Sequence, residues 1–171
     1  MDKKIKIALA DSMRDFHLPR YEQLPDVGLY LEQTVKYINQ CLRPLGCMEI
    51  TGSMIRNYVK QGLVPNPVQK HYYAEQIAYL ICITMLKQVA QLEYISKLFS
   101  RQRVTYTNQM AYDYFCMEME NVLYHRFGLK PEIEDVGVTS SLEKEMLRSA
   151  ITAVSHIIYF HACFQHLSSA P

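Results

Sequence analysis

The polar side chains between residues 51 and 61 are the ones in this chain best suited to binding chemistry. Ile55 and Val59 stand four residues apart, so on a helix they share one face. The remaining surface carries Ser53, Arg56, Asn57 and Lys60. A guanidinium can hold a phosphate or read guanine through two hydrogen bonds. Because residues 51–73 contain no acidic side chain, the pattern predicts a surface that binds a polyanion.

Each of these side chains also has a plainer interpretation. Arg56 is the first candidate for a phosphate or base contact, and the alternative is a surface arginine or an intramolecular ion pair. Lys60 and Lys70 are expected on the backbone of a nucleic acid, with solvated surface lysines as the alternative. Ser53 and Asn57 can reach phosphates or base edges.

The same segment contains its own start and stop signals. Thr51 can cap the beginning of a helix of about three turns, Gly62 allows a left-handed end, and Pro65 prevents the helix from resuming. Tyr58 has two interpretations: its hydroxyl contacts a phosphate, or its ring packs into the core. The segment is therefore predicted to be a short helix that presents side chains.

A helix-turn-helix follows from the residues before this segment. A helix is predicted over residues 27–42, with Asp26 as its N-cap and Pro44 and Gly46 after its end. Its apolar face repeats at helical spacing through Leu31, Val35, Ile38 and Leu42. The two helices are then joined by a compact turn.

The later elements are predicted from their own patterns. Residues 64–73 hold two prolines and an asparagine before Tyr72 and Tyr73, which predicts a turn or small hairpin. A buried helix is expected over residues 74–89, and a shorter one follows before Arg101 and Arg103 lead into a polar connection. Two long helices are expected over residues 108–127 and from a Ser140–Glu143 capping box to about residue 167. The first 15 residues are weakly patterned.

The order of these parts resembles the DNA-binding domain of the MerR family of transcriptional regulators. The matching positions are Thr51, Ile55, Arg56, Tyr58, Gly62, Leu63 and Pro65, then Tyr73 and Glu75-Gln76-Ile77-Ala78-Tyr79-Leu80. MerR wings usually carry Arg-x-Tyr where this chain has His71-Tyr72-Tyr73. The resemblance implies that residues 51–61 enter the major groove and that the wing over residues 64–73 lies on the backbone. The implied DNA-binding residues are Thr51, Ser53, Arg56, Asn57, Tyr58, Lys60, Lys70, His71 and Tyr73.

A second resemblance covers roughly residues 16–100. The segment Leu18-Pro19-Arg20-Tyr21-Glu22-Gln23-Leu24-Pro25-Asp26, with Leu29-Tyr30, is similar to a bacterial family called domain of unknown function 1836. That name implies no activity. The predicted fold is mainly α: a MerR-like winged helix-turn-helix over residues 16–103 with a small β wing, then a helical C-terminal region over residues 104–171 with two long helices.

The composition divides the chain into two halves of opposite charge. The whole chain of 171 residues carries a net charge of +1. Residues 1–103 have 14 basic and 9 acidic side chains, and residues 104–171 have 4 and 8. A basic front suits nucleic acid, which the MerR resemblance specifies as double-stranded DNA, and an acidic back suits a partner or water. Five cysteines without a C-x-x-C pair, no secretory signal and no long apolar run predict a soluble cytoplasmic protein without a membrane span.

The last helix is predicted to form a homodimer. Its seam would consist of Leu147, Ile151, Val154, Ile158 and His161, which keep a coiled-coil-like spacing. The alternative is a long helix folded back onto its own core. The main hypothesis is a dimeric DNA-binding transcriptional regulator, and the rival is a protein-interaction module that kept the winged fold without useful DNA affinity.

Other chemistry has weaker support in the sequence. His156, His161 and His166 are five residues apart and do not share a helical face, so we expect no metal and no cofactor. A small-molecule effector pocket is possible through Tyr106, Tyr112, Tyr114, Tyr124 and Tyr159, although aromatic residues on helices are usually core. Enzyme motifs such as G-x-S-x-G and H-E-x-x-H are absent from the sequence, and a pair of Cys116 and His125 has no supporting spacing. We therefore expect no enzyme.

Overall fold

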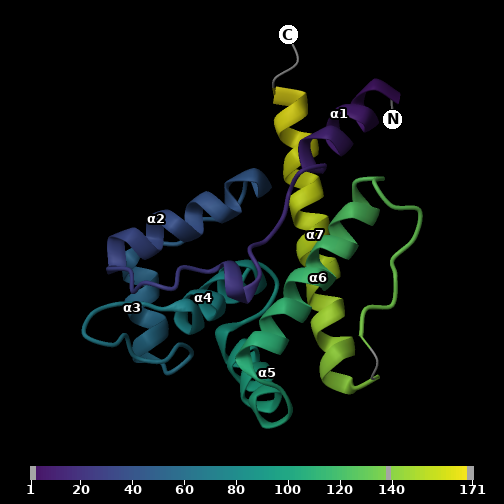
Figure 1. Ribbon diagram of the computed structural model, residues 1–171. Helices are drawn as coiled ribbons and strands as arrows, with labels where there is room; N and C mark the ends of the chain where they lie inside the picture. Colours follow the sequence, from purple (N-terminus) through teal and green to yellow (C-terminus); the bar gives the residue numbers. More distant parts are fainter. Residues whose placement is uncertain (1–2, 138–139, 169–171) are drawn as a thin grey trace.

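The computed structural model describes residues 3–137 and 140–168, which form a mainly helical protein (Figure 1). Its α-helices are α1 (Lys3–Met13), α2 (Leu31–Leu42), α3 (Gly52–Lys60), α4 (Ala74–Leu86), α5 (Leu92–Thr105), α6 (Asn108–Arg126) and α7 (Leu142–Ser168). Two 3-10 turns, η1 (Tyr21–Gln23) and η2 (Arg43–Leu45), stand before α2 and after it. The mainly α prediction and its two long C-terminal helices are confirmed.

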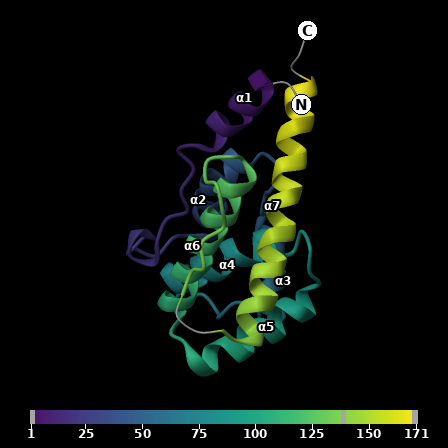
Figure 2. The ribbon, with the colours of Figure 1, turned by 90° about the vertical axis from the view of Figure 1, so that its right-hand side faces the viewer.

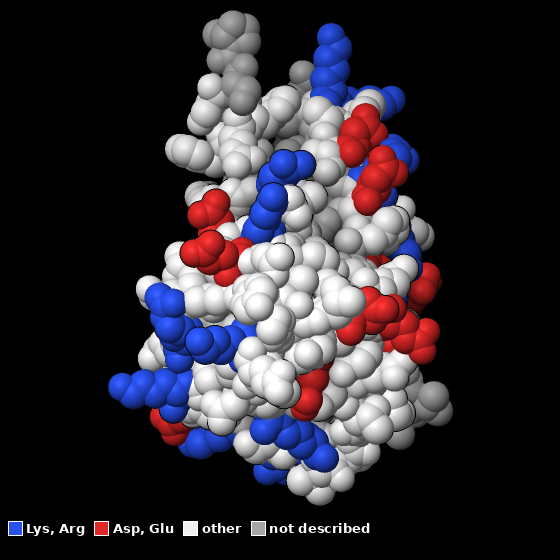
Figure 3. Space-filling model, turned by 60° about the vertical axis from the view of Figure 1, so that its left-hand side comes forward, with Lys and Arg blue, Asp and Glu red and all other residues white. Residues whose placement is uncertain are grey.

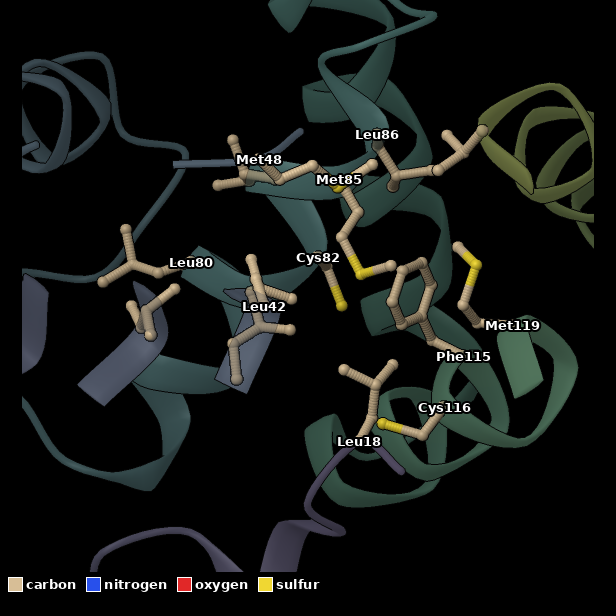
Figure 4. Packing of buried hydrophobic residues seen from close by; sticks show 14 of the residues in the cluster. Leu18, Leu42, Met48, Leu80, Cys82, Met85, Leu86, Phe115, Cys116 and Met119 are labelled. Atoms are coloured by element: carbon tan, nitrogen blue, oxygen red, sulfur yellow. The ribbon is translucent and has the colours of Figure 1, made fainter. Parts of the chain in front are cut away.

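Helix α4 lies at the centre of the core. Its residues from Gln76 to Leu86 are all buried, as the even distribution of apolar residues around this helix predicts. Figure 4 shows the side chain of Met85 extending toward Phe115 of α6, with Leu18 and Cys116 nearby. One hydrophobic cluster includes residues on both sides of position 103, so the two predicted regions share a core. The boundary between them stays a prediction.

Helices α6 and α7 pack against each other on one side of this centre, to the right of α4 in Figure 1 and nearer the viewer in Figure 2. The face of α7 turned toward the core consists of Ile151, Val154 and Ile158, which are fully buried, with Leu147 partly buried beside them. This is the row that the sequence predicted as a dimer seam, and it is covered within the chain. The prediction of that seam was therefore wrong in its residues, and the alternative of a helix folded onto its own core is correct for this face.

Several predicted boundaries need correction. Helix α2 begins at Leu31 rather than at residue 27, because the backbone of Leu29 pairs with Tyr72 in an antiparallel bridge. Its N-cap is Tyr30, not Asp26. The backbone N–H of residue 144 donates to Ser141 Oγ at 3.2 Å, so Ser141 rather than Ser140 caps α7.

Other corrections concern the N-terminal residues and the wing. The weakly patterned N-terminus forms α1, whose Leu9 and Met13 are buried. Helix α5 continues through Arg101 and Arg103, so these arginines are not part of a connection. In the described ranges the wing contains isolated β-bridges and no strand, so a β wing in the usual sense is not present there. Within the same ranges, no helix has both the length and the apolar character needed to cross a membrane.

Candidate nucleic-acid interface

Helix α3 has one buried face and one exposed face, as its sequence predicts. Ile55 is fully buried. Ser53, Arg56, Asn57 and Lys60 are all exposed. Thr51 Oγ1 accepts a hydrogen bond from Met54 N at 3.3 Å, and Gly62 has a φ of +73°, so the predicted cap and stop are both confirmed.

Tyr58 belongs to the buried face. Its side chain is 3% exposed, and burial raises the pKa of its hydroxyl. The predicted phosphate contact is therefore not available to Tyr58, and the alternative of a packing residue is the one the structure supports.

The turn before α3 is clamped by a single side chain of α2. Asn39 Nδ2 donates to Ile50 O at 3.0 Å, and Ile50 N donates to Asn39 Oδ1 at 2.8 Å. Both groups of Ile50 are thereby satisfied although the residue is buried. The clamp fixes where α3 begins relative to α2, which a helix that docks as a rigid unit requires.

The cations on and near α3 form no ion pairs with other residues that the structure describes. Among the residues the structure describes, no ion pair or hydrogen bond engages the side chains of Arg56, Lys60 or Lys70. Arg56 lies close to Tyr72, where its charge opposes the rise in the tyrosine pKa that burial causes. Arg56 therefore joins the surface of α3 to the base of the hairpin. The predicted alternative of an intramolecular ion pair for Arg56 has no support in these residues.

The predicted wing is a two-residue hairpin turn. Val68 N donates to His71 O at 3.0 Å and His71 N donates to Val68 O at 2.9 Å. The two residues between them, Gln69 and Lys70, have φ values of +48° and +67°, the left-handed conformation that such a tight turn demands. Lys70 thus occupies the tip of the hairpin, as a contact to a phosphate backbone would require.

The hairpin is fixed to the beginning of α2. Leu29 N donates to Tyr72 O at 2.9 Å, and Tyr72 N donates to Leu29 O at 2.8 Å. A side chain at Gly28 would meet the Cβ of His71 at 2.7 Å and the ring of Tyr73 at 2.8 Å, so only glycine permits this approach. Tyr73 is partly exposed at the end of the hairpin. Hairpin and helix pair therefore form one rigid surface.

His71 is held by neighbouring groups in this hairpin. Its Nδ1 lies 2.8 Å from the carbonyl oxygen of Gln69, and its ring lies 4.2 Å from the ring of Tyr30, centroid to centroid. Nδ1 must carry the proton to donate to that carbonyl, which leaves Nε2 for other contacts. His71 thus supports the hairpin, and a role in DNA contact is limited to its second nitrogen.

Lys87 and Tyr30 are two further residues of this surface that the sequence did not indicate. Lys87 Nζ lies 3.7 Å from the Sδ of Met54 on α3, and desolvation lowers the pKa of this lysine. Met54, Asn57 and Lys87 line an open hollow with the turn between α4 and α5. Lys87 ends an apolar run in the sequence, and its contact with Met54, 33 residues earlier in the chain, is visible only in the structure. Tyr30 is more than half exposed beside His71.

The face that α2 and α3 line is mixed in charge. Figure 3 shows lysine and arginine side chains at the left and lower edge and again near the top, with acidic side chains along the right and also among them on the left. Glu32 in the first turn of α2 and Glu49 before α3 are both exposed. The positive surface is therefore local rather than general.

The other candidate sites from the sequence do not come together. The described residues contain no group of three or more His, Cys, Asp or Glu side chains placed to hold a metal ion. All five cysteines are free thiols. Cys116 is fully buried, and burial raises its pKa to about 12, so it carries little thiolate near neutral pH.

The tyrosines considered for an effector have different surroundings. Tyr112 lines a cavity between α4, α5 and α6 of about 20 Å³, which has room for water rather than for an organic effector. The hydroxyls of Tyr112 and Tyr114 are buried, and neither has a hydrogen-bond partner among the described residues. Tyr124 donates to Phe16 O at 2.5 Å, and Tyr159 packs against Phe127.

The segment before α2 is anchored to α6. Arg20 Nη1 and Nη2 donate to Glu120 Oε1 and Oε2 at 2.8 and 2.7 Å, and Leu18 N donates to Glu120 Oε1 at 2.9 Å. Tyr21 N donates to Asp113 Oδ1 at 2.8 Å. Residues 18–21, on which the second resemblance depends, therefore need α6 for their position.

A sequence profile of the family described as Domain of unknown function (DUF1836) matches residues 19–124. The chain belongs to this family. The matched range extends past the predicted resemblance, from the segment around Arg20 through most of α6, and so includes both ends of the Arg20–Glu120 pair. No curated protein and no solved structure matches the chain. The description of the DUF1836 family names no activity.

Proposed function

We propose that this DUF1836 protein is a DNA-binding transcriptional regulator. Helix α3 would enter the major groove, and the hairpin at residues 68–71 would lie on the adjacent phosphate backbone. The observation that carries the proposal is the exposed face of α3, where no ion pair within the described residues engages Arg56 or Lys60. Cations that a fold leaves unpaired on a clamped helix are available to an anionic ligand.

The order of elements supports the same proposal. A helix, a clamped turn, α3, a tight hairpin and a buried helix follow one another as in the winged helix-turn-helix of MerR-type regulators. We propose that the DUF1836 fold is a variant of that domain in which the wing is reduced to a two-residue turn. The place of the wing arginine is taken by His71, so Lys70 at the tip supplies the charge of this wing.

Each side chain then has a chemical role in the proposed complex. Arg56 would read a base or hold a phosphate with two hydrogen bonds. Asn57 Oδ1 accepts from Gln61 Nε2 at 3.1 Å, which orients its amide so that Nδ2 is free to donate. Lys60 and Lys70 would contact phosphates on either side. Thr51 and Ser53 stand at the N-terminus of α3, where phosphate oxygens are favoured.

The rival function is supported by a different observation. Val27, Tyr30 and Val68 are each more than half exposed around the hairpin, and Glu32 and Glu49 lie close to α2 and α3 in the chain. A mixed apolar and charged surface of this kind suits a protein partner. In that case the fold would serve protein interaction and DNA affinity would be absent.

A salt series on duplex DNA tests the proposal. Binding to a pool of random duplexes should be detectable at low salt and should fall steeply as salt rises, with a log–log slope of about −3 or steeper if three cations per chain contact phosphates. Replacing Arg56 and Lys60 by alanine should flatten the slope by about 2 and weaken binding. A charge-matched control replaces Arg14, which follows α1 and pairs with Asp11, and Lys97 of α5, which pairs with Glu93; this double-alanine variant should bind normally.

Two results would reject the proposal. An absence of any complex at low salt would reject DNA binding, and equal binding by the Arg56/Lys60 variant and the control would reject the α3 face as the DNA-binding surface. The single substitution Arg56→Ala then assigns its role: a loss of about 1–3 kcal/mol confined to preferred sequences indicates base reading, and an equal loss on all sequences indicates a phosphate contact.

A further inference from the structure

A row of uncharged side chains runs along the outward face of α7. Its members are all exposed and are spaced alternately four and three residues apart: Leu142, Met146, Ser149, Ala153, His156, Phe160 and, seven residues later, Leu167. We call this set the α7 row. Phe164 is exposed beside it. From residue 149 to residue 168 the helix has no Asp, Glu, Lys or Arg. Figure 2 shows α7 along one edge of the molecule for its whole length.

The α7 row is distinct from the buried face of the same helix. Ile151, Val154 and Ile158 face the core, while Ala153, His156 and Phe160 face away from it. Helix α7 is therefore apolar on two faces, and the fold of one chain covers only the first. A surface helix of a monomer usually carries charged residues on its outer face.

The exposed area matches what a second chain would need. Leu142, Met146, Phe160, Phe164 and Leu167 are each half to two-thirds exposed. At roughly 200 Å² for each fully exposed large side chain, they leave about 600 Å² of apolar surface on each chain. This is at the upper end of the patches found on monomers, which reach about 300–600 Å². Doubled, it approaches the lower limit of about 1,200 Å² for a stable protein interface.

The spacing of the α7 row is that of a coiled-coil seam. Leu142, Ser149 and His156 repeat every seven residues, as do Met146, Ala153, Phe160 and Leu167. A seven-residue repeat with two seam positions in each heptad is the pattern by which one helix packs along another over several turns. The row extends over 25 residues, or about 38 Å at 1.5 Å per residue.

The sizes of the side chains along the α7 row favour a second copy of the same helix in antiparallel orientation. Large side chains stand at the two ends, and the small Ser149 and Ala153 stand before the middle. In an antiparallel pair of identical helices with Ala153 opposite His156, Ser149 lies opposite Phe160. In a parallel pair each Phe160 would meet its own copy, and the small residues would meet theirs and leave voids. Antiparallel helix dipoles also attract.

We propose that this protein forms a homodimer by antiparallel pairing of two α7 rows. The row is self-complementary, so the partner is a second copy of the same chain. The proposal does not depend on DNA binding, and it uses the opposite face of α7 from the seam that the sequence predicted. The homodimer would contain two α3 helices, one from each chain.

Sedimentation of the full chain measures the dimer directly. The wild-type protein should sediment as a species of twice the chain mass of 20.0 kDa at micromolar concentrations. Phe160→Glu should raise the dimer dissociation constant by at least about a hundredfold, because it places a charge inside a dry seam twice. Val104→Glu replaces an apolar residue on α5 that is 87% exposed, and this control should leave the dimer intact.

A charge pair tests the direction of the helices. Phe160→Lys alone should weaken the dimer, and adding Ser149→Glu should restore it, since residue 149 of one chain lies opposite residue 160 of the other. In a parallel dimer the same double variant would place like charges together and weaken association further. Both positions are exposed in the single chain, so a circular dichroism spectrum equal to the wild type is expected for every variant.

Several results would overturn the proposal. They are a wild-type protein that stays at 20.0 kDa up to millimolar concentration, a dimer that neither Phe160→Glu nor Leu167→Glu weakens, or a double variant that fails to restore association. A monomeric wild type that binds phosphatidylserine vesicles through Phe160 would assign the α7 row to a lipid surface instead. Loss of DNA binding with an intact dimer would reject the proposed function and leave this proposal standing.

Discussion

Arg56 on α3 and Arg148 on α7 show how one residue type is used in two regions of this protein. Arg148 donates through Nε to Glu118 Oε1, and its Nη2 donates to Glu118 Oε2 at 3.3 Å and to Glu134 O at 3.1 Å. Glu118 is fully buried. Arg56 is exposed, and no described residue pairs with it. The first arginine neutralises a buried charge, and the second is left for a ligand.

The comparison extends to the surrounding charges. Arg20 pairs with Glu120 of α6, and Lys144 of α7 pairs with Asp135, so the charges of α6 and α7 bind other parts of the chain. Around α3, by contrast, Lys60 and Lys70 are exposed at positions where the chain provides no partner among its described residues. The acidic side chains of residues 104–171 are thus largely engaged in internal ion pairs, whereas the basic side chains around α3 are exposed to solvent.

Replacing each arginine in turn should give the largest difference in stability between the two regions. Arg148→Met should lower the free energy of unfolding by about 3 kcal/mol, because it leaves the buried carboxylate of Glu118 uncompensated. Arg56→Met should change it by less than about 0.5 kcal/mol. Urea unfolding followed by circular dichroism measures both. Equal stability of the two variants would show that the Arg148 pair is not buried in solution.

Removing the Asn39 clamp on α3 should have an intermediate effect on stability, and it should impair both stability and DNA binding. Asn39→Ala leaves the buried N–H and C=O of Ile50 without partners, at a cost of about 2 kcal/mol. DNA binding should weaken as well, since α3 loses its fixed position, whereas Arg56→Met affects binding alone. Gln40→Ala on the exposed side of the same helix serves as the control. Unchanged stability in Asn39→Ala would contradict the clamp.

The smallest expected effect is at the tip of the hairpin and has the opposite sign. Gln69 has a φ of +48°, which a residue with a Cβ adopts at some cost, so Gln69→Gly should stabilise the protein by about 0.5–1 kcal/mol. Gln69→Ala keeps the Cβ and should leave stability unchanged. Thermal unfolding compares the three proteins. A destabilised glycine variant would indicate that the left-handed turn does not form in solution.

The local features of α3 could be predicted because their causes lie within a few residues. Thr51 accepts from the backbone three residues later, and Gly62 ends the helix through its own φ. The hairpin was predicted from its turn residues, but its pairing with Leu29 was not, because two segments more than 40 residues apart carry no mutual signal in one sequence. The start of α2 was misplaced for the same reason.

The two faces of α7 show a second limit of sequence reasoning. The rows through Ile151 and through Ala153 both repeat at coiled-coil spacing, and the sequence does not say which of them meets the core. The aliphatic row has the stronger seam pattern in the sequence, yet β-branched residues on that face are what α6 and α4 bury.

The pair of Arg20 and Glu120 joins residues 100 positions apart, and this has a consequence for synthesis of the chain. At about 5–20 residues per second, Glu120 is made roughly 5–20 s after Arg20. During that interval the apolar surface of α4 lacks α6, and the segment at Leu18 has no carboxylate to accept its N–H. The front half of the nascent chain therefore cannot complete its core on the ribosome. A chain that stalls before α6 is made would expose the apolar surface of α4 to chaperones and proteases.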